Sequence, residues 1–551
     1  MSVIQSGTRS ENSLWVFCRF LLTIGAMTQP SLAQPSLAQP SLAQPSLAQP
    51  GSHRLELLSG EARLLRSVAP PPRALQKPEG EQFETVNLIE QHIRFVGADT
   101  LPPRGSVELT FIAQVSGVDQ LSLFMRGADE NELSFEFSRD GESWSPVSTR
   151  SFVNGTFSVL LPESLEASET ARIRYSTAMD FSNEGPPSRV IDRPLAHLLT
   201  SNYQLFNVEG SIFDSYILTT TISGDGSINP GGIGALIARP SPGEAGDWVY
   251  QTEIDSYLSV YAVGGQYPQR YDELIEVFDP PSSFGAVNNG VILSAVEEAV
   301  AVYEELYGPF PYSRLGVYPI SDRAGAAIGP QAQILLPWYF WIEGFEVQDP
   351  TFEPRSVTYH EIAHQYFFNA VRLHPDPSRG QAWLSEAMAE FSAVRALEET
   401  GGDGRRHRWI NYLIYVLTVP EGDEAPVASF EVIEHPYYFQ TTYLRGSTLV
   451  YGMYHRMSDF TEKLRDCVIS WRGLFIDSRD MFACFSSMTP KPGYESFSVD
   501  SYRDRYFAGT LRDQISVSAR WVDDESSELI INDQEWSDAL EIVTFSPQGE
   551  I

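Results

Sequence analysis

From about residue 84 the chain alternates between apolar and polar positions, a pattern that predicts β-strands with one buried face. Residues 107–115 place Val, Leu, Phe, Ala and Val at every second position. Residues 133–137 alternate in the same way and lead into Asp140-Gly141, a pair that is typical of hairpin turns. These runs predict strands and favour a β-sandwich.

More strands are expected further along the chain. Residues 216–221 and 257–263 are rich in β-branched and aromatic side chains, which favour strands. Gly185-Pro186-Pro187 marks a break between these strands and the earlier ones. We therefore expect a β-rich region over residues 84–275. Its first part, residues 84–180, either completes the same sheet or forms a separate binding module.

A mixed helical and strand pattern follows this region. Apolar residues recur at helical spacing over 292–306, and Gly308 then suits the end of a helix. Residues 314–320 and 331–336 read as strands, and the second is expected to form the edge of a cleft where an extended substrate pairs. The aromatic run at 338–341 either lines a subsite for a bulky side chain or packs under a helix.

One helix-compatible segment carries candidate metal chemistry. His360 and His364 would lie one turn apart on one helix face, where their imidazoles can hold one Zn²⁺ with Glu361 beside the metal as general base. Glu386, at the start of a second predicted helix, is the candidate third ligand. Such a set leaves one position for a water whose pKa zinc lowers toward about 7. The alternative is a helix with two structural histidines. The first helix is expected to continue until Pro375.

These residues resemble the zinc site of the aminopeptidase N family of gluzincin peptidases. The resemblance covers roughly residues 245–460. Its matching segments are 303–312, 360–365, Asn369, 383–387 and 442–446. It implies a thermolysin-like α/β catalytic domain at 276–465, preceded by a β-saddle. It also implies one zinc ion per chain, a peptide or protein substrate, and an oxyanion-stabilising role for the Tyr443 hydroxyl.

The chain departs from the family's pattern in two places. Three more residues than usual separate His364 from Glu386, an insertion that the loop 373–381 can absorb. Ile328 stands where the family's G-x-M-E-N motif has the Glu that binds the substrate's amino terminus. Because a buried cation without a carboxylate is costly, peptide-bond hydrolysis is better supported than aminopeptidase specificity.

Two other functions remain open. The first is a peptide- or glycan-binding protein on an inactive peptidase fold, although binding alone has no chemical need for Glu361 or Tyr443. The second is hydrolysis of a small non-peptide substrate such as an epoxide, which one branch of the resembled family performs.

Length and charge narrow the classes of partner. With 551 residues, 42% of them apolar, the chain can form about three domains, so we expect a multidomain protein with a short C-terminal region at 466–551. The formal net charge of -34 argues against nucleic acid or anionic membranes as partners.

The N-terminus predicts export. Arg9 and Arg19 precede the apolar run 20–27, and Ser31-Leu32-Ala33 offers small residues to a signal peptidase. We therefore expect a signal peptide at 1–33, a periplasmic or extracellular location, and no membrane span in the mature chain. The Pro-rich repeats that follow predict a disordered spacer at 34–83.

Two cysteines belong to the mature chain, because Cys18 lies in the predicted signal peptide. Cys467 and Cys484 either form a disulfide, which an exported protein permits, or remain two buried thiols.

Overall fold

The structure, a computed structural model, describes the chain from residue 86 onward, and these residues belong to one unit, Arg63–Ile551. The described residues are 86–96, 104–124, 134–153, 156–178, 197–200, 216–224, 232, 234–241, 243–254, 260–263, 268–270, 274–278, 289–320, 327, 329–337, 340, 354–374, 377–420, 422–428, 435–509, 515–521, 527–533 and 542–545. The predicted signal peptide and spacer lie outside them.

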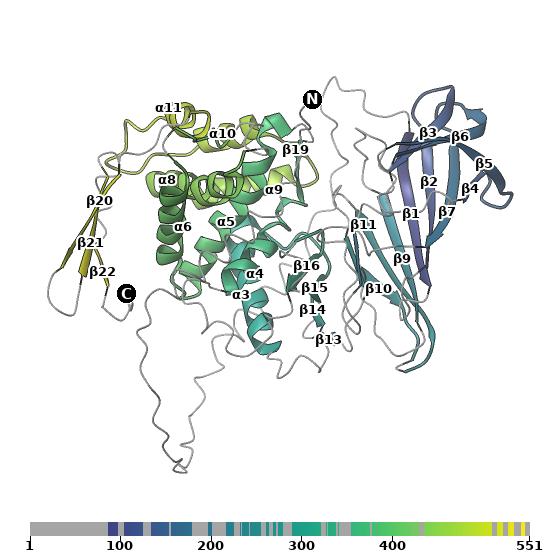
Figure 1. Cartoon of the computed structure of the whole chain (residues 1–551), viewed down its shortest axis with the longest axis horizontal. Coiled ribbons are helices and arrows are strands. Elements are labelled where there is room, and N and C mark those ends of the chain that lie inside the picture. The colour runs from purple at the N-terminus through teal and green to yellow at the C-terminus, as the bar shows by residue number, and fades with distance from the viewer. Residues whose placement is uncertain are drawn as a thin grey trace, which may run out of the picture. The chain divides into compact units, whose positions relative to one another are not determined.

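Ten strands of the predicted β-rich region form one sheet, in the order β10-β11-β9-β1-β2-β7-β4-β5-β6-β3 (Figure 1). The strands are β1 (Val86–Val96), β2 (Arg104–Ala113), β3 (Val118–Phe124), β4 (Ser134–Ser138), β5 (Ser145–Val153), β6 (Thr156–Leu165), β7 (Thr170–Ala178), β9 (Tyr216–Gly224), β10 (Ala235–Ala238) and β11 (Gly246–Ile254). Strand β1 pairs antiparallel with β2 and parallel with β9. Strands from both sides of residue 185 therefore share one sheet.

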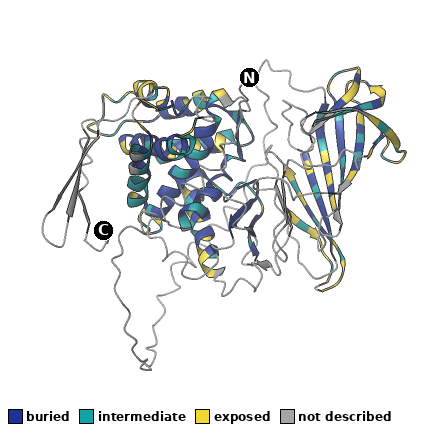
Figure 2. Cartoon of the chain, viewed as in Figure 1, coloured by how far each residue is buried: buried dark blue, intermediate teal, exposed yellow. Residues whose placement is uncertain are grey.

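The apolar positions that predicted these strands form their buried face. Val107, Leu109 and Phe111 are almost fully buried, and Figure 2 shows buried and exposed residues alternating along the strands. β4 and β5 pair antiparallel on either side of Asp140-Gly141, with Phe135 opposite Val147, which confirms the predicted hairpin. Two further strands, β8 (His197–Thr200) and β12 (Val260–Val263), form a separate antiparallel pair.

A smaller sheet begins the second half of the described chain. Strands β14 (Ile275–Phe278), β15 (Leu315–Ile320) and β16 (Gln333–Pro337) are parallel, and β13 (Pro268–Arg270) joins them antiparallel. Between β14 and β15 runs α3 (Asn289–Tyr307), which ends at Gly308 with a φ of 89°. The predicted helix and both predicted strands are therefore confirmed.

Helices make up most of the remaining described residues, and most of these helices contribute buried side chains to one large core (Figure 2). Tyr412 and Tyr415 of the helix at 404–418 belong instead to a smaller cluster with Leu444. The helices are α4 (Pro354–Ala363), the 3₁₀-helix η6 (Pro377–Arg379), α5 (Gln381–Glu399), α6 (Gly404–Thr418), the π-helix η7 (Gln440–Arg445), α8 (Gly446–Arg456), α9 (Phe460–Trp471), α10 (Ser478–Ser486), α11 (Val499–Tyr502) and the π-helix η8 (Arg503–Phe507). Two short strands, β17 (Phe367–Phe368) and β18 (Val371–Leu373), pair through β18 with β19 (Phe475–Ile476). Three more, β20 (Ile515–Trp521), β21 (Ser527–Asp533) and β22 (Ile542–Phe545), form an antiparallel sheet.

Helix α4 is shorter than the sequence predicts. It ends at Ala363, well before Pro375. The amides of Gln365 and Tyr366 bond three residues back, and Phe368 has a φ of 97°, so the backbone tightens and then turns into β17. The amide of His364 still bonds to the carbonyl of His360, which keeps the two histidines one turn apart.

Cys467 and Cys484 form a disulfide, so they are not two free thiols. Cys467 on α9 joins Cys484 on α10. Of the aromatic run 338–341 only Phe340 is described, and it is buried in the large core. Packing is therefore the role of this side chain. None of the helices among the described residues has the length and hydropathy to cross a membrane.

Arg314 links the small sheet to the segment between β9 and β10. Its guanidinium donates to the carbonyl oxygens of Gly232 and Gly234, both at 2.8 Å, and forms an ion pair with Glu276 on β14. The Tyr318 hydroxyl donates to the same Gly232 carbonyl at 3.2 Å. These buried hydrogen bonds satisfy backbone carbonyls that no strand pairing covers.

Candidate active site and metal centre

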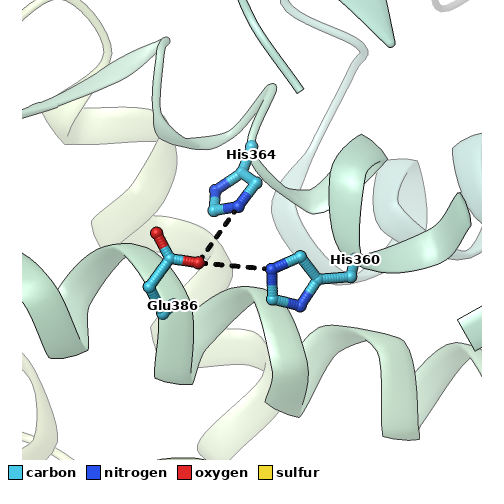
Figure 3. A group of neighbouring side chains, drawn as sticks. All are labelled: His360, His364 and Glu386. Carbon is cyan, nitrogen blue, oxygen red and sulfur yellow. Dashed lines mark hydrogen bonds and ion pairs between the residues drawn. The ribbon is translucent and has the colours of Figure 1, made fainter. Parts of the chain in front are cut away.

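Helix α4, the turn that follows it and helix α5 bring the three predicted metal ligands together. Glu386 Oε2 lies 3.3 Å from His360 Nε2 and 3.4 Å from His364 Nε2 (Figure 3). One ligand atom from each residue lies within 4.8 Å of the others. Zinc bonds of about 2.0–2.1 Å in a tetrahedron place neighbouring ligand atoms about 3.4 Å apart. The donor set therefore fits one Zn²⁺.

The start of α5 fixes the position of Glu386. Gly380 precedes the helix in the left-handed conformation, with a φ of 89°. A Cβ added to Gly380 would lie 1.9 Å from Ser478 Oγ, so only glycine fits. Trp383, fully buried in the first turn of α5, donates from Nε1 to the same hydroxyl at 2.8 Å. The first turn of α5 is thereby anchored just before Glu386.

Gln365 ties the end of the histidine helix to the strand β16. Its side-chain oxygen accepts from the amide of Ala332 at 2.7 Å. Its side-chain nitrogen donates to the carbonyls of Pro330 and Gln333, at 2.9 and 3.0 Å. The amide is fully buried, so these bonds hold the strand edge at a fixed distance from the site.

Asn369 closes the same junction. Its amide donates to the carbonyls of Gly329 and His364, at 2.8 and 2.7 Å. A Cβ on Gly329 would lie 2.2 Å from the carbonyl oxygen of Glu361. The turn before β16 can therefore press against the helix only because residue 329 is glycine.

The charges of His360 and Glu386 depend on each other. Burial disfavours the charged form of His360, but its hydrogen bonds to Glu386 and Glu390 raise its pKa to about 10. Burial likewise opposes the charge of Glu386, but His364 and His360 hold its pKa well below the ordinary value. A divalent cation bound between these groups would take the place of the imidazole proton.

Glu361 has the environment of a general base. Burial raises the pKa of its carboxyl, while the neighbouring His360 and His364 oppose that rise. A carboxylate with a raised pKa holds a proton more readily, so it is better suited to accept one and pass it on.

Tyr443 lies in η7, and its ring stacks on the imidazole of His360. The two ring centres are 5.6 Å apart and the planes differ by 10°. Burial, and then the charge of Glu386, raise the pKa of Tyr443 well above its ordinary value. The phenol therefore keeps its proton and can donate a hydrogen bond. Tyr438 packs edge-on against this ring at 6.1 Å.

Glu390 is a third carboxylate beside the histidines, and it was not among the residues predicted from the sequence. Its Oε2 lies 3.1 Å from His360 Nδ1, and its Oε1 lies 2.9 Å from His407 Nε2. Asn411 donates to the same Oε1 at 2.6 Å. The available signal was position, because Glu390 follows Glu386 by four residues and so shares its helix face.

A search with family models finds none that matches the chain, and no curated protein matches it. Among solved structures, an M1 zinc metallopeptidase from Deinococcus radiodurans is 17% identical and has a TM-score of 0.55, covering 78% of this chain and 94% of that one. A variant of it from the same organism, bound to a Tyr-Ser-Ala substrate, is 16% identical at a TM-score of 0.54, covering 78% and 95%. A two-domain M1 zinc metallopeptidase variant bound to L-tryptophan is 16% identical at 0.56, covering 78% and 96%. At this level of identity the likeness concerns the fold, which is that of the multidomain M1 zinc metallopeptidases.

Proposed function

We propose that the protein is an exported zinc-dependent metallopeptidase that hydrolyses peptide bonds. The observation that carries this proposal is the convergence of His360, His364 and Glu386 on one place, with Glu361 and Tyr443 beside it. The three ligands would hold one zinc ion per chain. The shared M1 fold supports the proposal, and solved relatives of that fold include one bound to a peptide substrate.

We call the position between His360 Nε2, His364 Nε2 and Glu386 Oε2 the metal place. Each residue around it has a separate task. When bound, the zinc would polarise the scissile carbonyl and lower the pKa of water. Glu361 takes the proton from the attacking water and later passes it to the leaving amine. The Tyr443 hydroxyl donates a hydrogen bond to the carbonyl oxygen as negative charge develops on it. An extended substrate pairs with the edge of β16, which Gln365 and Asn369 hold beside the site.

Export and the domain limits form part of the same proposal. A signal peptide at 1–33 and a spacer at 34–83 would precede the β-rich region 84–275, the peptidase domain 276–465 and the C-terminal region 466–551. The disulfide between Cys467 and Cys484 supports export, because disulfides persist in oxidising compartments.

The decisive experiment separates metal binding from turnover. Glu361→Gln should keep about one zinc per chain and lower kcat/KM on a peptide substrate by several orders of magnitude, since an amide cannot accept the water's proton. His364→Ala should lose the zinc itself. Elemental analysis and mass spectrometry of a digested peptide mixture measure both effects.

Two results would count against this function. Near-normal turnover in Glu361→Gln would remove the general base from the mechanism. A wild-type protein that holds zinc but cuts no peptide in a diverse mixture would favour a binding protein or a hydrolase of small non-peptide substrates.

We further propose that the enzyme does not require a free α-amine. Ile328, which lies outside the described residues, occupies the place of the family's amine-binding Glu in the matched motif. An apolar side chain cannot favour a charged amino terminus over a blocked one. N-terminal acetylation of a good peptide substrate should therefore change kcat/KM by less than about tenfold. Loss of activity on every acetylated peptide would show that another carboxylate binds the amine.

A further inference from the structure

Glu390 is a buried carboxylate to which the proposed mechanism assigns no task. It lies on α5 one turn after Glu386, and its side chain is 12% exposed. Burying an anion is costly unless hydrogen bonds compensate for the lost water. Here three donors do so: the Nδ1 of His360 at 3.1 Å, the Nε2 of His407 at 2.9 Å and the amide of Asn411 at 2.6 Å.

The contact with His360 fixes which ring nitrogen carries the proton. In a neutral imidazole one nitrogen donates a hydrogen bond and the other offers a lone pair. Because a carboxylate only accepts, Nδ1 of His360 donates to Glu390. Nε2 faces Glu386, and a cation bound there would take the lone pair of Nε2, so that the ring's one remaining proton would be held on Nδ1 by Glu390. His364 differs, since its Nδ1 is buried without a hydrogen-bond partner among the residues that the structure describes.

Helix α6 holds Glu390 from the other side. His407 and Asn411 lie one turn apart on α6 and both contact the same oxygen of Glu390. The first residue of this helix, Gly404, allows close packing on α5, because a Cβ there would lie 2.4 Å from the carbonyl oxygen of Val394. The N-cap Asp403 accepts from the amide of Arg406 at 2.9 Å, which fixes where α6 begins.

We propose that Glu390 is a positioning residue that sets the tautomer and orientation of His360, and that His407 and Asn411 act on the metal site only by holding Glu390. The inference rests on the proposed function for the identity of the metal. A carboxylate that accepts a hydrogen bond from the second nitrogen of a metal-binding imidazole raises the basicity of that imidazole. Loss of such a carboxylate weakens metal affinity by about 10–100-fold.

The test is the zinc affinity of the purified full chain, measured by competition with a chromophoric chelator. Glu390→Ala and Glu390→Gln should weaken zinc binding by about 10–100-fold. Glu398→Gln is the matched control, because Glu398 lies on the same helix but contacts Arg395 and Tyr451 instead of the metal place. It should leave the zinc affinity within about twofold of the wild type. The melting temperature of each metal-free variant reports separately on folding.

Two further readouts separate positioning from general damage. Proton NMR of the zinc-loaded wild type should show a slowly exchanging, downfield Nδ1–H of His360, which disappears in Glu390→Ala and persists in Glu398→Gln. His407→Ala and Asn411→Ala should each weaken zinc binding, but neither should weaken it further when combined with Glu390→Ala, because all act through one carboxylate.

Several outcomes would overturn the proposal. Zinc affinity within twofold of the wild type in both Glu390 variants would refute it, as would additive effects of the α6 variants. Neither result would count against the proposed zinc ligands His360, His364 and Glu386. Absence of zinc from the wild type would instead refute the proposed function and this inference with it. A zinc-loaded wild type that cuts no peptide would refute the peptidase function alone, and Glu390 would still be tested.

Discussion

At the scale of single residues, burial sets the protonation states that the chemistry needs. It raises the pKa of the Glu361 carboxyl and keeps the proton on the Tyr443 hydroxyl, so one group is ready to accept a proton and the other to donate a hydrogen bond. The spacing of His360 and His364 predicted the metal place, because helical periodicity alone puts two residues four apart on one face.

Tyr443→Phe tests the oxyanion role. The variant keeps the ring that stacks on His360 but loses the hydroxyl, so kcat should fall by about 10²–10³-fold, the usual effect of removing one oxyanion donor. KM should change little. Tyr438→Phe is the matched control, since Tyr438 packs against Tyr443 yet has no role in the mechanism. Equal kcat values for the two variants in steady-state kinetics would disprove the assignment.

His407 and Asn411 could not be predicted in the same way. His407 and Asn411 lie on a different helix from Glu390, and only the packing of α6 on α5 brings them to its carboxylate. The sequence contains no periodic signal for a contact between two helices. Ile328, in contrast, was identified from the sequence alone, because it stands where the resembled aminopeptidase motif has a Glu.

At the scale of elements, the apolar pattern predicted where strands and helices lie better than where they end. The C-terminal end of α3 followed from Gly308, whose positive φ the sequence could suggest. The end of α4 depends instead on Gln365 and Asn369, whose side chains bond to the distant segment at residues 329–333. Long-range hydrogen bonds of this kind override local helix propensity.

Asp477 shows how one cap stabilises a helix and how that stabilisation depends on pH. Its carboxylate accepts from the amides of Arg479 and Asp480 at the start of α10, at 2.8 and 3.4 Å. Burial opposes the charge, but the hydrogen bonds from Arg479 lower the pKa of Asp477 below its ordinary value. The stabilisation should therefore be complete above the unfolded-state pKa of about 3.9 and be lost as the pH falls through the lower folded-state pKa.

Asp477→Ala should lower the free energy of unfolding by about 1 kcal/mol at pH 7, the usual cost of losing an N-cap. The difference from the wild type should shrink in urea titrations carried out below pH 4. Ser498→Ala is the control for an uncharged cap. The Ser498 hydroxyl caps α11 but does not titrate, so the effect of this variant should not depend on pH. A deficit in Asp477→Ala that stays constant down to pH 3 would rule out the carboxylate as its cause.

At the scale of the whole molecule, the sequence predicted a β-rich region followed by a mixed helical and strand region, while the pairing of distant strands and segments comes from the structure. Alternation predicted the strands, but it could not predict that β1 pairs with β9, which begins more than a hundred residues later. Nor could it reveal that Arg314 bonds to the segment between β9 and β10, because a lone arginine before a strand has many possible partners.

Arg314→Met tests the importance of this link. The substitution leaves Glu276 charged and nearly buried without its cation, a change that typically costs about 3–5 kcal/mol. The double variant Arg314→Met with Glu276→Met should recover part of the loss, because the unpaired charge is gone, but not the hydrogen bonds to Gly232 and Gly234. Urea unfolding of the three proteins provides the comparison. A double variant less stable than Arg314→Met would contradict the interpretation.

The π-helix η7 means that the active site also depends on how many residues its helix contains. A π-turn holds one residue more than an α-turn, and η7 continues directly into α8. Removing Leu444 would allow this stretch to wind as an ordinary α-helix and would rotate Tyr443 by about 100° about the helix axis. The phenol would turn away from His360 although every catalytic side chain was still present. A gain or loss of one residue would thus move the proposed oxyanion donor away from the histidine, and a comparison of residue identities alone would overlook it.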